Sequence, residues 1–121
     1  TDMWIIHPSL GAFSVVLASD LSTHLPDPDK VMVRARRTEH LQLLQERCTQ
    51  LADAEILETA ATDYRWRIVV EKADFASALG EIAGEIDYTN VKSCASQNKA
   101  SVGSGFVAAM SRIWSALYSI Q

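Results

Sequence analysis

The stretches Val31-Met-Val-Arg-Ala-Arg36 and Tyr64-Arg-Trp-Arg-Ile-Val-Val70 decide the predicted fold. Both are rich in β-branched, aromatic or other apolar residues, which favour strands. Arginines alternate with apolar side chains in each run. Since successive side chains of a strand point to opposite faces, each run is predicted to be a strand with its arginines on one face. This pattern is typical of an antiparallel sheet with one packed and one solvated face.

The flanking sequence predicts further strands and three helices. Short apolar runs bounded by turn residues predict strands, and apolar residues at helical spacing predict helices. The predicted strands cover 3–7, 12–19, 31–36, 55–59 and 64–70. The predicted helices cover 38–53, 73–86 and 105–121. Thr38 is the predicted N-cap of the first helix. The apolar helical stripes predict the buried core residues, which are Leu44 on the first helix, Phe75, Leu79 and Ile82 on the second, and Met110, Ile113 and Leu117 on the last.

The order β-β-β-α-β-β-α-α indicates an α+β fold, a two-layer arrangement of an antiparallel sheet with helices on one face. The strand–helix–strand–strand–helix portion is partly ferredoxin-like. A chain of 121 residues suits a single domain, here 1–121. The polar segment 93–104, rich in Ser, Gly and Asn, is predicted to be a flexible loop.

Composition excludes several classes of protein. Hydrophobic residues make up 48% and charged residues 21%, which is typical of globular domains. The net charge of -4 argues against a general nucleic-acid binder, which is usually basic. Apolar runs are too short to span a bilayer, so no membrane partner is predicted. The start of the chain lacks the pattern of a signal peptide, and two cysteines make no disulfide framework, so a cytoplasmic location is expected.

Six motifs spread over most of the chain resemble an uncharacterised family of short bacterial proteins of unknown function. They are Met3-Trp4, Phe13-Ser-Val-Val16, Arg34-Ala-Arg36, Asp63-Tyr-Arg-Trp-Arg67, Ile86-Asp-Tyr-Thr-Asn-Val-Lys92 and Ile113-Trp114. The chain departs from the family pattern at Val91, where the family has Phe, and in the Ser- and Gly-rich stretch after Lys92. The resemblance implies the element boundaries and no activity.

The arginines of the two deciding strands form the first candidate site. They are Arg34, Arg36, Arg65 and Arg67. The planar fork of arginine suits phosphate and carboxylate groups, so a shared face would bind an anionic ligand or an acidic protein partner. The alternative is a solvated outer face on which Glu55 and Glu58 neutralise the arginines across strands. Trp66 and Tyr64 are predicted on the opposite face, which makes a nucleic-acid partner unexpected, because such sites combine basic and stacking side chains.

A polar cluster is the second candidate site. If the end of the second helix packs against the start of the 64–70 strand, six polar side chains meet there. They are Asp63, Tyr64, Asp87, Tyr88, Asn90 and Lys92. The group would suit a small enzyme site. It would equally suit a structural network, with Asn90 capping the second helix and Lys92 opposing its dipole.

No catalytic residue, metal site or cofactor is predicted. His7, His24 and His40 are isolated, and no His or Cys spacing matches a zinc site. The expected function is a small non-enzymatic binding or adaptor module that uses the arginine face. Two rivals remain: a small enzyme at the polar cluster, and a structural homodimer that uses the wide apolar stripe of the last helix.

Overall fold

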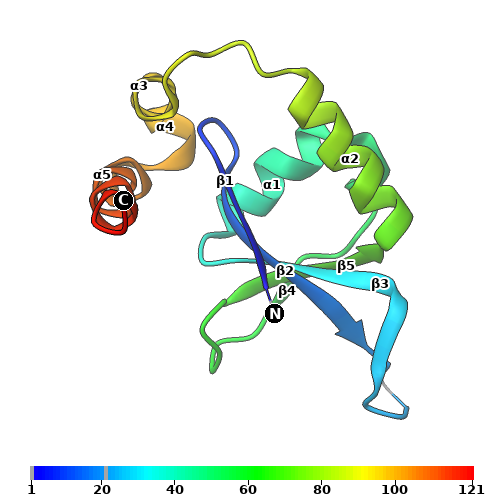
Figure 1. Cartoon of the computed structure of the whole chain (residues 1–121). Helices are drawn as coiled ribbons and strands as arrows, with labels where there is room; N and C mark the ends of the chain where they lie inside the picture. The colour runs from blue at the N-terminus through cyan, green and yellow to red at the C-terminus, as the bar shows by residue number, and fades with distance from the viewer. Residues whose placement is uncertain (1, 21) are drawn as a thin grey trace.

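The computed structural model describes residues 2–20 and 22–121 and has the predicted α+β architecture, with helices packed on an antiparallel sheet (Figure 1). The five strands follow the order β1-β2-β3-β5-β4, and every neighbouring pair is antiparallel. Their bounds are β1 Met3–His7, β2 Gly11–Ser19, β3 Pro26–Ala35, β4 Leu57–Glu58 and β5 Trp66–Glu71. The sheet therefore has two edges, β1 and β4.

The second half of the sheet explains the ferredoxin-like portion. Strand β5 lies between β3 and β4 and is antiparallel to both. Strands β3 and β4 are joined through α1 (Thr38–Arg47) and a short 3-10 turn (Thr49–Leu51). This is a split β-α-β unit, in which a third strand inserts between two strands connected by a helix. It brings the two arginine-bearing strands, β3 and β5, side by side.

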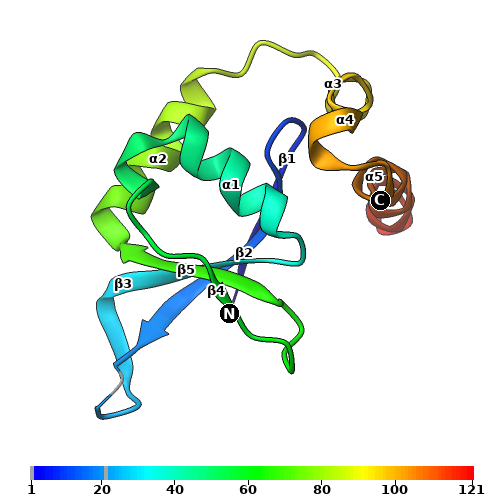
Figure 2. The same cartoon turned by 180° about the vertical axis from the view of Figure 1, so that it is seen from behind.

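Helices α1 and α2 (Lys72–Gly84) cover one face of the sheet (Figures 1 and 2). The main core lies between them and the inward side chains of the strands, including Val33 and Ile68, which are fully buried. Each inward position alternates with an outward one, so the predicted facing of β3 and β5 is confirmed. Of the predicted core residues on these helices, Leu44, Phe75 and Ile82 are buried and Leu79 is half-buried.

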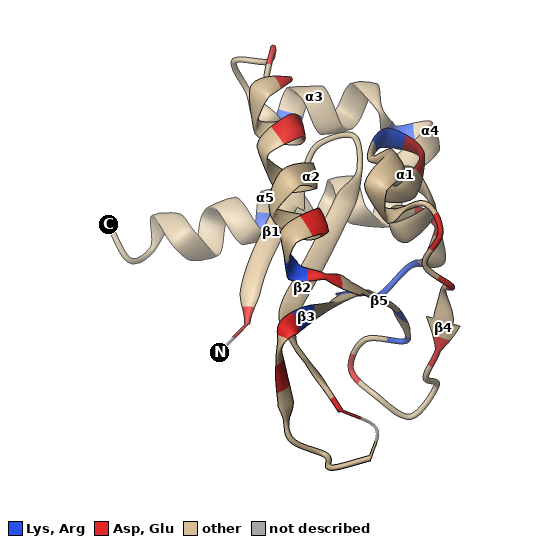
Figure 3. Cartoon of the chain, turned by 90° about the vertical axis from the view of Figure 1, so that its right-hand side faces the viewer, with Lys and Arg blue, Asp and Glu red and all other residues tan. Residues whose placement is uncertain are grey.

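The C-terminal helices make a second, smaller core beside the sheet. They are α3 (Val91–Gln97), α4 (Lys99–Val102) and α5 (Ser104–Tyr118). Their buried residues are Ala95, Val102, Phe106 and Met110, packed against Ala12 of β2 and Leu43 of α1. The C-terminal end of α5 points away from the rest of the molecule (Figure 3).

His40 of α1 joins the two cores. Its ring is buried, Nδ1 accepts the Ala12 N–H at 3.3 Å, and Nε2 contacts the Val102 carbonyl at 3.0 Å. Because a backbone N–H only donates, Nδ1 is the unprotonated nitrogen and Nε2–H donates to Val102. Gly11 makes room for the ring: its φ is +114°, and a Cβ there would collide with the imidazole.

Three predictions about segments are wrong. Residues 93–104 are not a loop, because α3 and α4 occupy most of them and bury Ala95 and Val102. Asn90 is the N-cap of α3, where its side chain accepts the Ser93 N–H at 2.9 Å, and it does not cap α2. Thr38 is the first residue of α1 and makes no capping bond.

The stripe of the last helix is only half covered. Met110 is buried and Ile113 half-buried, but Leu117 is 61% exposed. The prediction that Leu117 is buried is therefore wrong. Helical spacing placed these side chains on one stripe, and the described residues provide nothing to cover its second half. No described helix is long and apolar enough to cross a membrane.

Candidate functional site: an arginine pair on the open sheet face

The register of β3 and β5 sets Arg34 directly opposite Arg67. Cross-strand partners project from the same face, and here that is the face not covered by α1 and α2. The same row continues to Ser14 of β2 and Trp4 of β1. Like charges directly opposite each other destabilise a sheet, so this pair is an unfavourable arrangement unless something compensates it.

Arg34 has an acidic partner. Its guanidinium donates to the Asp2 carboxylate and to the Ser14 hydroxyl, both at 2.8 Å, and Ser14 donates to the same carboxylate oxygen at 2.6 Å. The Ser14 hydrogen bond is the main cause that lowers the pKa of Asp2; burial opposes it, and the Arg34 charge lowers the pKa further. Only 19% of the Arg34 side chain is exposed. The Arg34 charge is thus neutralised on one side.

Arg67 forms no ion pair with any described residue. One terminal nitrogen donates to the Thr62 hydroxyl at 2.9 Å and to the Tyr64 carbonyl at 3.1 Å, which are neutral acceptors. Burial, followed by the Arg34 charge, lowers the pKa of the guanidinium, which still remains protonated at neutral pH. The Nε atoms of both Arg34 and Arg67 are buried and lack a hydrogen-bond partner among the described residues. Buried donors of this kind need an explanation.

Tyr64 supports the arginines from their own face. Its ring lies under the guanidinium groups of Arg34, at 4.7 Å, and Arg36, at 4.2 Å. The prediction that Tyr64 shares the face of Trp66 is therefore wrong. Tyr64 precedes β5, which begins at Trp66, so strand alternation does not govern its side chain. Trp66 itself packs partly against the main core, as predicted.

Arg65 does not join this group. Its Nε donates to Glu58 of β4 at 2.7 Å, and its guanidinium lies over Trp66 at 5.6 Å. Glu58 and Trp66 are cross-strand partners on the helix-covered side, so the Arg65 head group is turned away from Arg67. The expected neutralisation by Glu58 thus holds for Arg65 alone. We define the arginine cluster as Arg34, Arg36, Arg67 and the supporting Tyr64.

The predicted polar cluster is not assembled. Asp63 and Tyr64 enter β5 at one end of the molecule, while the segment after α2 lies at the other (Figure 1). Asp87 and Tyr88 instead line a polar hollow of about 480 Å³, together with His7 and Ser9 at the β1–β2 turn. Lys92 lies over the Trp114 ring at 4.4 Å, which ties α3 to α5.

The polar hollow contains ionisable groups from four elements. Its lining residues are His7, Ser9, Arg47, Glu85, Asp87, Tyr88, Cys94 and Asn98. Arg47 and Glu85 neutralise each other at 2.6 Å. His7 Nδ1 accepts the Ser9 N–H at 3.1 Å, and burial lowers the pKa of the ring. Its groups are thus largely satisfied by one another, which is the pattern of a structural network.

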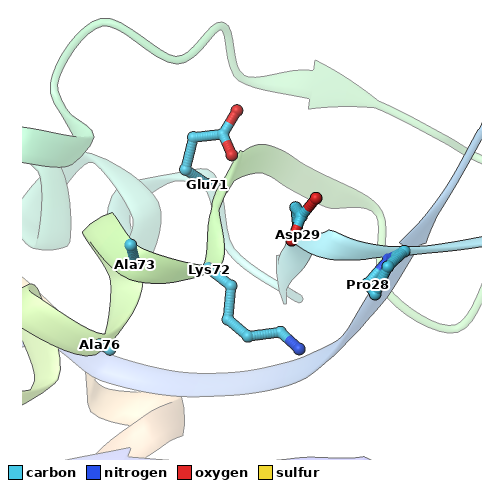
Figure 4. Close-up of a pocket in the computed structure, with 6 residues that line it drawn as sticks. All are labelled: Pro28, Asp29, Glu71, Lys72, Ala73 and Ala76. Atoms are coloured by element: carbon cyan, nitrogen blue, oxygen red, sulfur yellow. The ribbon is translucent and has the colours of Figure 1, made fainter.

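A second hollow of about 460 Å³ lies where β3 begins and α2 starts (Figure 4). Lys72 points away from the carboxylates of Asp29 and Glu71 there, and the remaining lining is Pro28, Ala73 and Ala76. Its polar groups do not converge. In the described part of the chain, no group of three or more His, Cys, Asp or Glu residues is arranged to hold a metal ion.

The expectation from sequence that Trp4 and Trp114 belong to the core, like Trp66, is wrong, and Asp2 was not expected beside the row. Trp4 is 73% exposed on the open face, although tryptophan side chains are mostly buried in folded proteins. Asp2 neutralises Arg34 from outside β1. The face of Trp4 could be predicted from the β1–β2 hairpin, because the register of the hairpin determines which side chains of β1 share a face with those of β2.

Comparison with known proteins adds no family: no protein-family model, curated protein or solved structure matches the chain. The resemblance to an uncharacterised bacterial family therefore stays a prediction.

Proposed function

We propose that this protein is a small non-enzymatic binding module whose arginine cluster takes an anionic group from a ligand or an acidic partner. One observation carries the proposal: Arg34 and Arg67 stand directly opposite each other, and Arg67 forms no ion pair within the described residues. A half-buried guanidinium that has no acidic partner and lies opposite a second guanidinium is electrostatically unfavourable.

A bound anion would resolve this arrangement. A phosphate or carboxylate carries negative charge and several acceptor lone pairs, so it would offset the two guanidinium charges that stand opposite each other on β3 and β5. Arg36 stacks on Tyr64 beside them and forms no ion pair with a described residue, so it adds charge without needing to be detached from a partner. One terminal nitrogen of Arg34 already donates to the Asp2 carboxylate. An incoming anion would therefore bind mainly at Arg67.

The test uses the arginine side chains as reporters. In ¹⁵N NMR, titration with sodium phosphate should shift the Nε–H signals of Arg34 and Arg67, while sodium chloride at equal ionic strength should not. A Glu-rich peptide is the parallel probe for an acidic partner. Arg67→Gln removes its own Nε–H signal, and it should also abolish the phosphate-dependent shift of the Arg34 signal across the strand pair. Arg65→Gln is the matched control, because Arg65 is engaged with Glu58.

Either of two results would refute the proposal. One is the absence of any phosphate- or peptide-dependent shift at Arg34 and Arg67. The other is an equal loss of response in the Arg65→Gln and Arg67→Gln variants, which would indicate diffuse surface charge.

We also propose a homodimer through the exposed end of α5 and a reducing, cytoplasmic setting. Trp114, Leu117, Tyr118 and Ile120 are 51–81% exposed there, and a second copy offers the same apolar side chains. Cys48 and Cys94 are both free thiols, which fits a reducing compartment. Light scattering at high micromolar concentration tests the dimer: Leu117→Glu should convert it to a monomer, and a monomeric wild type would overturn it.

A further inference from the structure

We propose that the ligand of the open sheet face is a single-stranded nucleic acid, with bases stacking on Trp4 and phosphates held by the arginine cluster. This inference rests on the proposed function, because it assigns a chemical class to the anion. The sequence makes nucleic acid unexpected by placing aromatic and basic side chains on opposite faces. The structure puts Trp4 and Tyr64 on the arginine face.

The arrangement follows one row across four strands. Trp4 pairs with Ser14, Ser14 with Arg34, and Arg34 with Arg67. Adjacent strands are about 4.8 Å apart, so Trp4 lies roughly 10 Å from Arg34 and roughly 14 Å from Arg67 along the row. A strand of a few nucleotides laid across the sheet would therefore reach from the indole to both guanidinium groups.

Trp4 provides the stacking surface. Its indole is 73% exposed, on a strand at the sheet edge, and makes no aromatic pair among the described residues. Every base has a π-face, so one exposed indole beside a basic patch suits single strands without a requirement for sequence. Base pairs in a duplex keep their faces stacked on each other, which excludes this contact.

The guanidinium groups offer a second flat surface. Arg34 and Arg36 both lie over the Tyr64 ring, which holds their planes against the sheet. Guanidinium planes bind phosphate by their edges and stack on bases by their faces. This double use favours nucleotides over a simple anion.

The charge distribution keeps the interaction local. The chain carries a net charge of -4, while the arginine cluster has three positive charges and one ion-paired carboxylate, Asp2. With two or three phosphates neutralised, the logarithm of the affinity should fall against the logarithm of salt concentration with a slope of about -2. An acidic polypeptide would share this salt dependence but would leave Trp4 without a role.

The experiment measures anisotropy of 5′-fluorescein-labelled oligouridine and oligothymidine 12-mers with the full chain at low salt. Trp4→Ala should weaken binding about tenfold, since stacking on one aromatic side chain contributes about that factor. Leu25→Ala is the control, because Leu25 is an exposed apolar residue outside the row, and this variant should bind as the wild type does. Arg67→Gln should weaken binding and reduce the salt slope, whereas Arg65→Gln should not. The two oligomers together distinguish RNA from DNA as the preferred strand.

The outcomes distinguish the nucleic-acid inference from the proposed anion-binding function on which it rests. If phosphate shifts the Arg34 and Arg67 signals but Trp4→Ala binds oligonucleotides as the wild type does, the nucleic-acid inference fails and the anion-binding face stands. Equal affinity for a duplex of the same sequence would also overturn it. If neither phosphate nor oligonucleotide acts on this face, both proposals fail. Circular dichroism of each variant confirms that the fold is retained.

Discussion

The two cores of this molecule differ in depth, although apolar helical stripes mark α1 and α2 in one and α5 in the other. Among the described residues, the main core joins three strands, β2, β3 and β5, to α1 and α2 with fifteen buried side chains, whereas the core of α3–α5 has four. Helix α5 has a wide apolar stripe, yet half of that stripe faces solvent. The difference teaches that periodicity identifies which residues share a face of a helix, while the amount of burial depends on what the fold places opposite it.

The largest effect should come from the main core. Leu41 of α1 is fully buried there, so Leu41→Ala should lower the free energy of unfolding by about 3–4 kcal/mol. Met110→Ala in the small core should instead open α3–α5 locally with a smaller global loss. Chemical denaturation and amide hydrogen exchange of the two variants measure the contrast. Equal global losses would show that the two cores unfold as one unit.

The junction of the two cores should be nearly as sensitive. Gly11→Ala introduces a Cβ that collides with the His40 ring and forces alanine to a φ of +114°. We expect a loss of about 2–3 kcal/mol from strain and displacement of His40. Gly105→Ala is the control, because a Cβ at that position meets no neighbouring atom. Thermal denaturation compares them, and equal melting temperatures would contradict the role assigned to Gly11.

Mild acid should lower the stability of the junction between the two cores, where His40 is buried. Burial lowers the pKa of His40 below its ordinary value of 6.5, so the unfolded chain binds a proton at higher pH than the folded one. Stability is therefore complete above about pH 6.5 and falls as pH drops through that value toward the lower folded pKa. Protonated Nδ1 would also face the Ala12 N–H.

Melting temperatures between pH 8 and pH 5 test this prediction. The wild type should lose stability over this range, and His40→Asn should lose less, because only His7, whose pKa is also lowered by burial, then remains as a buried contributor. If His40→Asn left the pH dependence of the melting temperature unchanged, protonation of His40 would not contribute to the loss of stability.

The smallest effect should come from the exposed end of α5. Leu117 is 61% exposed, so Leu117→Ala should change the free energy of unfolding of the monomer by less than about 0.5 kcal/mol. Denaturation at low micromolar concentration measures this value. A loss above about 2 kcal/mol would mean that Leu117 is packed in solution, and the contrast between the two cores would then disappear.

Sequence was sufficient where a regular pattern ran through a whole element. Alternation in 31–36 and 64–70 predicted that Val33 and Ile68 face the helices, and both are fully buried. Helical spacing predicted α1, α2 and α5. It failed for residues 93–104 because α3 and α4 bury mainly two small apolar side chains, Ala95 and Val102, and their other positions are polar.

The candidate site was harder to predict than the fold. Sequence grouped four arginines, but the register decides which of them meet, and it pairs Arg34 with Arg67. Arg65 turns to Glu58 on the neighbouring strand β4, as the alternative of cross-strand neutralisation allowed, but the sequence pattern did not show which arginine would be neutralised. Tyr64 lies outside the regular strand, so alternation misplaced it. Asn90 was assigned to the wrong helix because the residue suits either end of a helix.

The edge position of β1 has a consequence for handling the protein. Its five residues carry no lysine or proline, and its outer row of backbone N–H and C=O groups pairs with no described strand. Such an edge is a template for adding a strand from another chain, so aggregation is expected to begin there when the hairpin is concentrated or partly unfolded. Ile6→Lys, at an exposed position of this edge, should delay that aggregation and leave the native sheet intact.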